Sequence, residues 1–261
     1  NYAGVTVEKK EGHTNFNGRD LLFIDLPGTY SLTARSLDEL VARNVIVNDN
    51  PDVIVNVLDA SNLERNLYLA AQLLELEKPM VIALNMADVA EEMGIKYDFK
   101  KMAELTGATI VSTVGRTNIG TKELLEATIS VAASQKAPGV TVNYGDLLEG
   151  KIAELVTALE EAGTVTYPLR WIAIKLLEND PDVVEKVKGF ANTEAVLQTA
   201  AAIREEIKDQ VDLDIVFQEY RHRYAVEVYN QSLTQAPKEI ETRSDRYDKI
   251  LTHRIWGLPI F

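Results

Sequence analysis

The sequence predicts an α/β fold with a mostly parallel sheet and an antiparallel edge hairpin, followed by an all-α helical domain. Two observations carry this prediction. In residues 1–138, short apolar runs typical of buried strands alternate with stretches of helical periodicity, which is the pattern of a parallel sheet covered by helices. After residue 138, helical periodicity continues without a further strand pattern.

The first expected element is a β-hairpin over residues 5–25. Asn17 and Gly18 are its predicted turn, since Asn-Gly is a strong signal for a two-residue hairpin loop. The hairpin is expected to add one antiparallel strand to the edge of the sheet. The other elements of this part are strands at 53–58, 80–84 and 109–111 and helices at 37–45, 63–74, 99–105 and 121–133.

A break at Ala137-Pro138-Gly139 separates the α/β part from the helical part. Three segments are therefore expected: an α/β domain over 1–138, a helical domain over 139–240 and a C-terminal segment over 241–261. The helices of the second domain are expected at 146–162, 168–178, 181–190, 193–208 and 213–233.

The C-terminal segment 241–261 has more basic than acidic residues and ends on an apolar stretch. Two interpretations stay open. The segment is a tail that packs on the domain, or it is a basic juxtamembrane segment that leads to a first membrane helix.

Composition excludes several function classes. With 40 acidic and 27 basic residues the formal charge is −13, which argues against a nucleic-acid partner because binding a polyanion needs a basic footprint. The absence of cysteine excludes disulfides, thiolate zinc sites and cysteine nucleophiles. No apolar stretch reaches the ~18–20 residues of a membrane span, so this chain itself is expected to be soluble.

The first motif is Asp25-Leu26-Pro27-Gly28, directly after the second hairpin strand. In nucleotide switches, an Asp at this position holds Mg²⁺ and the glycine amide meets the γ-phosphate, which a side chain would block. The alternative is an ordinary Pro-Gly turn.

The second motif is Asn85-Met86-Ala87-Asp88. The Asp88 carboxylate could accept both the ring N–H and the exocyclic amine of guanine, and Asn85 would tie the loop to its neighbours. The same Asn-x-x-Asp spacing at 17–20 and 179–182 is expected in a hairpin turn and a helix junction, whereas 85–88 directly follows a buried strand.

Two weaker signals agree in order and spacing with these motifs. Ser112-Thr113-Val114 follows the last strand and could supply backbone amides to the base oxygen, although such pairs are common in loops. Thr6 could offer its hydroxyl to Mg²⁺ and its amide to the γ-phosphate, although it also suits an ordinary strand. Together the four positions favour a guanine-nucleotide switch protein.

The phosphate-binding pattern G-x-x-x-x-G-K-[ST] does not occur in the chain. That loop supplies phosphate-binding amides, a lysine and a Mg²⁺-binding hydroxyl, and it would precede Thr6. We therefore expect an N-terminally truncated chain without its main phosphate-binding element.

The chain resembles the ferrous iron transport protein B (FeoB) family, whose N-terminal part is a P-loop GTPase-like domain. The segments that carry the resemblance are 3–12, 25–32, 59–69, 85–88, 170–178 and 248–261. The resemblance implies a GTPase domain and a helical domain that modulates nucleotide release, at the cytoplasmic face of the bacterial inner membrane. Both would precede a membrane permease for Fe²⁺.

The resemblance also implies roles for individual residues. Asp25, Leu26, Pro27 and Gly28 would begin switch II, with Thr6, Asp25 and Gly28 as the catalytic set around GTP and Mg²⁺. Activating K⁺ would be held partly by backbone carbonyls near Asn1 and Tyr2. The remaining GTP-binding positions would be Gly4, Val5 and Val7 with Thr6 in switch I, and Asn85, Met86, Asp88, Ser112, Thr113 and Val114 around the base.

Two other functions stay open. One is a soluble GTPase that acts on ribosomes or other assemblies. The other is a folded interaction fragment that binds no nucleotide, because the phosphate loop is absent. A homo-oligomer is also compatible with the sequence. His13, His222 and His253 are scattered and suggest no metal site.

Overall fold

The computed structural model describes residues 10–33, 36–163 and 167–237. The C-terminal segment 241–261 lies outside the described residues. So do the expected site residues Asn1, Tyr2, Gly4, Val5, Thr6 and Val7.

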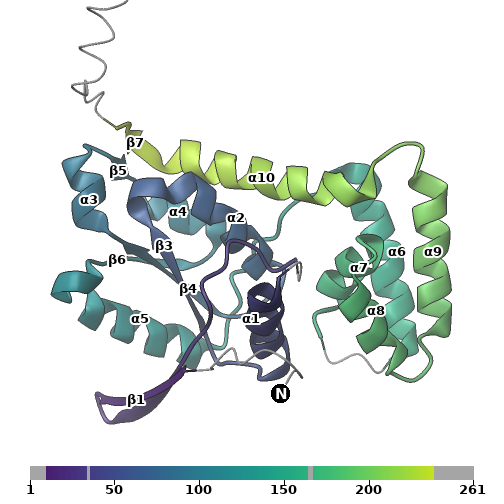
Figure 1. The fold of residues 1–261 in the computed structure, drawn as a ribbon, viewed down its shortest axis with the longest axis horizontal. Helices are drawn as coiled ribbons and strands as arrows, with labels where there is room; N and C mark the ends of the chain where they lie inside the picture. The colour runs from purple at the N-terminus through teal and green to yellow at the C-terminus, as the bar shows by residue number, and fades with distance from the viewer. Residues whose placement is uncertain (1–9, 34–35, 164–166, 238–261) are drawn as a thin grey trace, which may run out of the picture.

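The α/β part is built on a three-stranded parallel sheet in the order β3-β4-β6 (Figure 1). Its strands are β3 (Ile54–Asp59), β4 (Met80–Asn85) and β6 (Thr109–Ser112). The middle strand is buried from Met80 to Leu84 because neighbouring strands and helices cover it on every side. The main helices of this part are α1 (Leu37–Asn48), α2 (Leu63–Leu74), α4 (Phe99–Thr106) and α5 (Thr121–Ser134).

The predicted hairpin is present as β1 (Lys10–Phe16) and β2 (Arg19–Asp25). Asn17 and Gly18 both have positive φ, 52° and 75°, as a tight hairpin turn requires. In one respect the expectation was wrong: among the described residues the hairpin is a separate two-stranded sheet and not an edge of the parallel sheet. Within the described part of the chain, the backbone ladder of β2 pairs only with β1, and its apolar residues Leu22 and Phe23 are exposed.

The helical part contains all five expected helices. They are α6 (Gly145–Ala162), α7 (Leu169–Leu177), α8 (Pro181–Lys188), α9 (Glu194–Ile207) and α10 (Leu213–Ser232). Aspartate caps fix two of the starts: Asp180 accepts from two amides of α8, and Asp212 accepts from the amide of Asp214. The sequence therefore predicts this part well, and the α/β sheet followed by a helical domain is confirmed.

The last helix, α10, returns from the helical part to the α/β part. It lies along α2 and α4 and ends beside the parallel sheet (Figure 1). The chain then adds β7 (Leu233–Gln235), which pairs antiparallel with β5 (Lys96–Tyr97). One apolar core contains residues of both parts, so no gap in packing separates them at residue 138. The domain boundary at residue 138 therefore stays a proposal.

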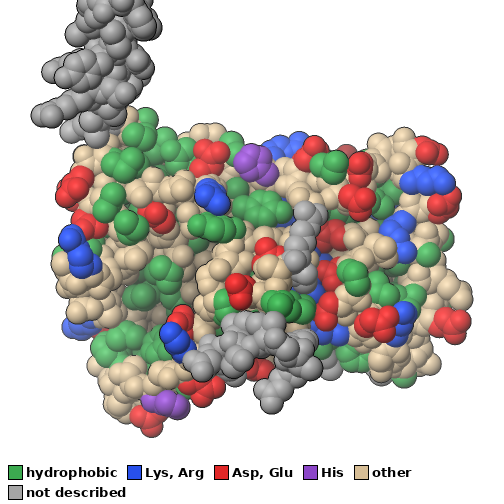
Figure 2. Space-filling view, viewed as in Figure 1, with side chains coloured by type: hydrophobic (Ala, Val, Ile, Leu, Met, Phe, Trp, Pro, Cys, Tyr) green, Lys and Arg blue, Asp and Glu red, His purple; other side chains and the backbone are tan. Residues whose placement is uncertain are grey.

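Acidic side chains are spread over the face seen in Figure 2, with lysines and arginines between them. Among the described residues, none of the helices combines the length and the apolar composition that crossing a membrane requires.

Candidate functional site

Two loops meet at the carboxyl end of the parallel sheet. β4 ends at Asn85 and β6 ends at Ser112, and the parallel register pairs Leu84 with Ser112. The amide of Thr113 donates to the carbonyl oxygen of Leu84 at 2.8 Å, which continues the pairing past the end of β6. The segments 85–88 and 112–114, which the sequence singled out separately, therefore lie side by side.

Asn85 links these two loops. Its carboxamide oxygen accepts hydrogen bonds from the amide of Gly115 at 2.9 Å and from the hydroxyl of Thr113 at 3.5 Å. Met86 follows in the left-handed conformation, with φ of 59°, and turns the chain into α3 (Ala87–Glu92). Asn85 thus ties its loop to the neighbouring one, as we expected from the sequence.

Asp88 lies in the first turn of α3 with its carboxylate at the surface. The side chain is 31% exposed, and Oδ2 lies 3.1 Å from Nη2 of Arg116. Arg116 is 82% exposed, so this ion pair is bordered by solvent. A carboxylate in this position can accept hydrogen bonds from a planar donor group that approaches from outside.

The backbone amides of Thr113 and Val114 already have acceptors within the chain. Thr113 donates to Leu84, and Val114 donates to the carbonyl oxygen of Ile119 at 2.9 Å. In this arrangement neither amide is free to reach a base oxygen, because each backbone N–H donates one hydrogen bond. Thr113 and Val114 therefore border the Asn85–Asp88 loop. Their backbone N–H groups are not free for the expected role of donating to the base oxygen.

The loop from 112 to 120 is closed by a glycine that sequence reasoning did not single out. Gly120 has φ of 78°, and a Cβ built on it would lie 2.1 Å from the carbonyl oxygen of Ser112. Only glycine fits this close approach. Gly115 and Arg116, which contact Asn85 and Asp88, were missed as well. The two glycines five residues apart were the one signal that could have directed attention beyond Val114.

Asp25 is exposed at the end of β2, where its backbone pairs with Lys10, and its carboxylate makes no hydrogen bond or ion pair with another described residue. Leu26 packs against the core, and Pro27 is half-buried. Gly28 is exposed, and a Cβ built on it would meet no atom within 4 Å. Among the described residues, no hydrogen bond joins 25–28 to the Asn85–Asp88 loop.

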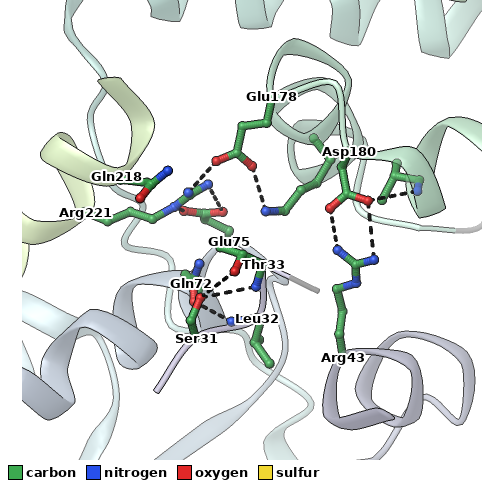
Figure 3. Close-up of polar contacts among 12 residues, drawn as sticks. Ser31, Leu32, Thr33, Arg43, Gln72, Glu75, Glu178, Asp180, Gln218 and Arg221 are labelled. Atoms are coloured by element: carbon green, nitrogen blue, oxygen red, sulfur yellow. Dashed lines mark hydrogen bonds and ion pairs between the residues drawn. The ribbon is translucent and has the colours of Figure 1, made fainter. Parts of the chain in front are cut away.

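The chain after Gly28 is fastened to helix α2. The hydroxyl of Thr29 donates to the carbonyl oxygen of Ser31, and the buried amide of Leu32 donates to Oε1 of Gln72 at 2.7 Å. Figure 3 shows Gln72 reaching this turn from α2. The segment that leads from Asp25 to α1 is thus held by a side chain from the neighbouring helix.

An exposed carboxylate without a protein partner suits a hard cation such as Mg²⁺, which prefers oxygen ligands and keeps several waters. The Asp25 carboxylate is exposed and has no partner among the described residues, and its expected co-ligand Thr6 lies outside them. Among residues 10–33, 36–163 and 167–237, no group of three or more His, Asp or Glu side chains is placed to hold a metal ion.

Sequence reasoning also missed a buried polar network between the α/β and helical parts (Figure 3). Arg221 of α10 lies between two carboxylates: its Nε is 2.6 Å from Oε1 of Glu75, and its Nη1 is 2.6 Å from Oε1 of Glu178. Tyr144 donates a further hydrogen bond to Glu75. Glu75 follows α2 directly and Glu178 follows α7, so Arg221 joins three helices from both parts.

The pKa of Glu178 reflects this environment. Burial alone would raise the pKa of its carboxyl, but the positive charges of Lys175 and Arg221 and their hydrogen bonds outweigh burial and lower it to about 2. Glu178 is therefore a carboxylate at neutral pH, as the ion pairs require.

A second arginine reaches the same short junction between α7 and α8. Arg43 of α1 is fully buried and forms ion pairs with Asp180 at 2.5 Å and with Asp182 at 2.7 Å. Glu178 and Asp180, two residues apart, thus receive Arg221 and Arg43 respectively. The α7–α8 junction is the point where α1 and α10 are both held.

The arrangement defines a class of protein. A mostly parallel α/β sheet, with an Asn-x-x-Asp loop tied to a second loop at its carboxyl edge, is the architecture of a G domain. Here a helical domain follows it.

The comparisons with known proteins agree with this class. The family model for ferrous iron transport protein B matches residues 1–128, and the model for the FeoB cytosolic helical domain matches residues 144–234. The Fe(2+) transporter FeoB of Staphylococcus aureus is 37% identical over the whole chain. The Fe(2+) transport protein A/FeoB fusion protein of Porphyromonas gingivalis is 36% identical over the whole chain.

Two solved structures are also similar. The cytosolic domain of T. maritima FeoB in its GMPPNP form has a TM-score of 0.77 at 28% identity, covering 90% of this chain and 88% of that one. A mutant of S. thermophilus NFeoB bound to GDP has a TM-score of 0.80 at 30% identity, covering 90% and 89%.

The chain belongs to the ferrous iron transport protein B family. It spans 39% of the length of the S. aureus transporter and 32% of the P. gingivalis fusion protein. These relatives favour the transporter interpretation over a soluble GTPase that acts on ribosomes.

Proposed function

We propose that this chain is the guanine-nucleotide-binding regulatory part of a ferrous iron transporter, located at the cytoplasmic face of the membrane. GTP hydrolysis in this part would regulate Fe²⁺ uptake through the permease domain of the longer protein. Family membership supports the context, and the related S. thermophilus domain has been solved with GDP. The observation that carries the proposal is the pairing of the Asn85 loop with the Gly115 loop beside the exposed carboxylate of Asp88.

Asp88 is the residue proposed to recognise the guanine base. Its carboxylate would accept hydrogen bonds from the ring N–H and the exocyclic amine of guanine. Adenine lacks that donor pair, so this residue would select guanine nucleotides. Asn85 would hold the loop in place, while Met86, Ser112, Thr113 and Val114 would border the base.

Asp25, Gly28 and Thr6 are the proposed phosphate-side residues. The carboxylate of Asp25 and the hydroxyl of Thr6 would hold Mg²⁺, and the amide of Gly28 would meet the γ-phosphate. When bound, Mg²⁺ neutralises charge on the phosphates. Backbone groups of residues 4–7 would contact the nucleotide, and carbonyls of Asn1 and Tyr2 would help to hold K⁺.

The helical domain would modulate nucleotide release through the ion pairs that join it to the α/β part. Arg43 lies on α1, the helix that follows the Asp25–Gly28 segment, and it is held by Asp180. If α1 moved when GTP is hydrolysed to GDP, the Arg43–Asp180 ion pair would therefore transmit the movement to the α7–α8 junction. Order–disorder changes in segments that contact the γ-phosphate are a common means of such signalling.

An equilibrium titration tests the proposal. The chain of 261 residues is titrated with a fluorescent GDP analogue in a buffer with Mg²⁺ and K⁺, and the complex is then competed with unlabelled GTP and ATP. We expect saturable binding that GTP displaces and ATP does not. Competition by ATP at the same concentration would contradict base selection by Asp88.

Asp25→Asn provides the matching test on the phosphate side. It should weaken the Mg²⁺ dependence of GTP binding and leave base selectivity unchanged. Absence of saturable binding up to millimolar GDP would instead favour the interaction-fragment alternative for this chain.

A further inference from the structure

Arg116 is placed against Asp88 by the same contacts that join the two loops. The amide of Gly115 donates to Asn85, and the guanidinium of the next residue, Arg116, donates to Asp88, three residues beyond Asn85. The turn around Arg116 is closed by hydrogen bonds from Val114 to Ile119 and from Thr117 to Val114. Backbone contacts on both sides thus hold Arg116 at the position from which its side chain reaches Asp88.

The group that Arg116 offers to Asp88 is chemically similar to the edge of guanine. A guanidinium has a carbon bonded to three nitrogens that carry N–H donors in one plane. In guanine, the carbon between the ring N–H and the exocyclic amine is also bonded to three nitrogens, and two of them carry donors in one plane. A carboxylate that accepts from one of these groups can accept from the other.

We propose that Arg116 is an internal competitor for the base site: its guanidinium occupies the Asp88 carboxylate when no nucleotide is bound, and guanine must displace it. This inference rests on the proposed function, because it assigns Arg116 a role in the affinity of the site for a guanine nucleotide. The solvent around Arg116, which is 82% exposed, gives the side chain room to move aside.

The size of the effect follows from the kind of ion pair. A solvent-exposed pair contributes little, so its removal from the free protein should tighten guanine nucleotide binding by about two- to fivefold. The effect should also decrease as salt increases, because exposed charges are screened. Association of GDP should become faster in the same proportion while its release is unchanged, because the pair exists only in the free protein.

The test is the affinity for a fluorescent GDP analogue, measured for the wild-type chain, Arg116→Ala and Arg116→Lys. We expect Arg116→Ala to bind more tightly by about two- to fivefold, with the ratio falling toward one at high salt. Arg116→Lys keeps the charge without the planar donor pair and should lie between the two. Lys122→Ala is the matched control, since Lys122 is an exposed cation that pairs with Glu126 and not with Asp88; its affinity should equal that of the wild type.

The Asp88→Asn background separates competition from a general charge effect. There, Arg116→Ala should change the affinity for xanthosine diphosphate far less than it changes GDP affinity in the wild-type background, because the neutral amide forms no ion pair with the guanidinium and holds it more weakly. If Arg116→Ala raised the xanthosine diphosphate affinity of Asp88→Asn as much as it raises the GDP affinity of the wild type, the competitor role would be overturned.

The remaining outcomes distinguish this inference from the function on which it rests. Unchanged or weaker GDP binding by Arg116→Ala, with normal wild-type binding, overturns the role of Arg116 and leaves the proposed function intact. Failure of the wild-type chain and of every variant to bind GDP overturns both for this chain.

Discussion

Nη1 of Arg43 lies 2.5 Å from Oδ2 of Asp180, although 137 positions separate the two residues in the chain. The Arg43 side chain has no exposed surface and that of Asp180 is 6% exposed, so the pair is buried between the α/β and helical parts. Asp180 also caps α8 by accepting from the amides of Asp182 and Val183. One carboxylate therefore both starts a helix of one part and holds a helix of the other.

Removing the arginine of this pair should be costly. Arg43→Ala leaves Asp180 as a buried charge without its cation, and we expect the free energy of unfolding to fall by about 3–5 kcal/mol. Urea denaturation of the two proteins measures the difference. Lys188→Ala, which removes an exposed cation paired with Glu185, is the control and should change stability by less than about 0.5 kcal/mol. Similar midpoints for Arg43→Ala and the control would refute the structural role of the pair.

Stability should depend on pH through Glu178. Its pKa is lowered from the ordinary 4.5 to about 2 in the folded chain, so its contribution is fully present above about pH 4.5 and is lost as pH falls toward 2. Glu178→Gln should therefore be less stable than the wild type at pH 6, and the difference should shrink as pH falls toward 2. Thermal or urea unfolding across this range measures it. Glu205→Gln, at an exposed site, should show no such convergence.

Gly120 should resist substitution. A Cβ in Gly120→Ala would lie 2.1 Å from the carbonyl oxygen of Ser112, and the positive φ of 78° adds strain. We expect a loss of about 1–3 kcal/mol in unfolding free energy and weaker GDP binding, because the loop that carries Gly115 would shift.

Gly150→Ala is the matched control for this prediction. Gly150 lies inside α6 with no atom within 4 Å of the added Cβ, so alanine there should stabilise the chain by about 0.5–1 kcal/mol. Equal stability of the two alanine variants would contradict the close approach at Gly120.

The helical part could be predicted well from local sequence. Its helices are long, periodic and marked at their starts, as Asp180 and Asp212 show by capping α8 and α10. The short strands β5 and β7 could not be predicted, because Lys96–Tyr97 and Leu233–Gln235 are too short for periodicity and pair across most of the chain. The position of α10 against α2 is likewise a tertiary contact that no local pattern encodes.

The site could be predicted only where residues follow strands. Asn85 and Asp88 could be predicted because a buried strand is expected just before them, and because a carboxylate suits the two neighbouring N–H donors of guanine. Arg116 was missed, since an arginine in a loop is ordinarily a solvated surface residue. Arg43 and Arg221 were missed because nothing in the local sequence shows that an arginine is buried, and because their carboxylate partners lie far away in the chain.

The base specificity of Asp88→Asn is the most direct test of whether Asp88 binds the guanine base. Affinities for GDP and xanthosine diphosphate are measured by competition for the wild type, Asp88→Asn and Asp20→Asn. Asp20→Asn is the control because it makes the same change in an Asn-x-x-Asp sequence in the exposed hairpin turn. We expect that Asp88→Asn alone loses GDP affinity and gains xanthosine diphosphate affinity, since an amide N–H can donate to the exocyclic carbonyl oxygen that xanthine carries in place of the amine of guanine. Unchanged preference for GDP in Asp88→Asn would show that Asp88 does not bind the base.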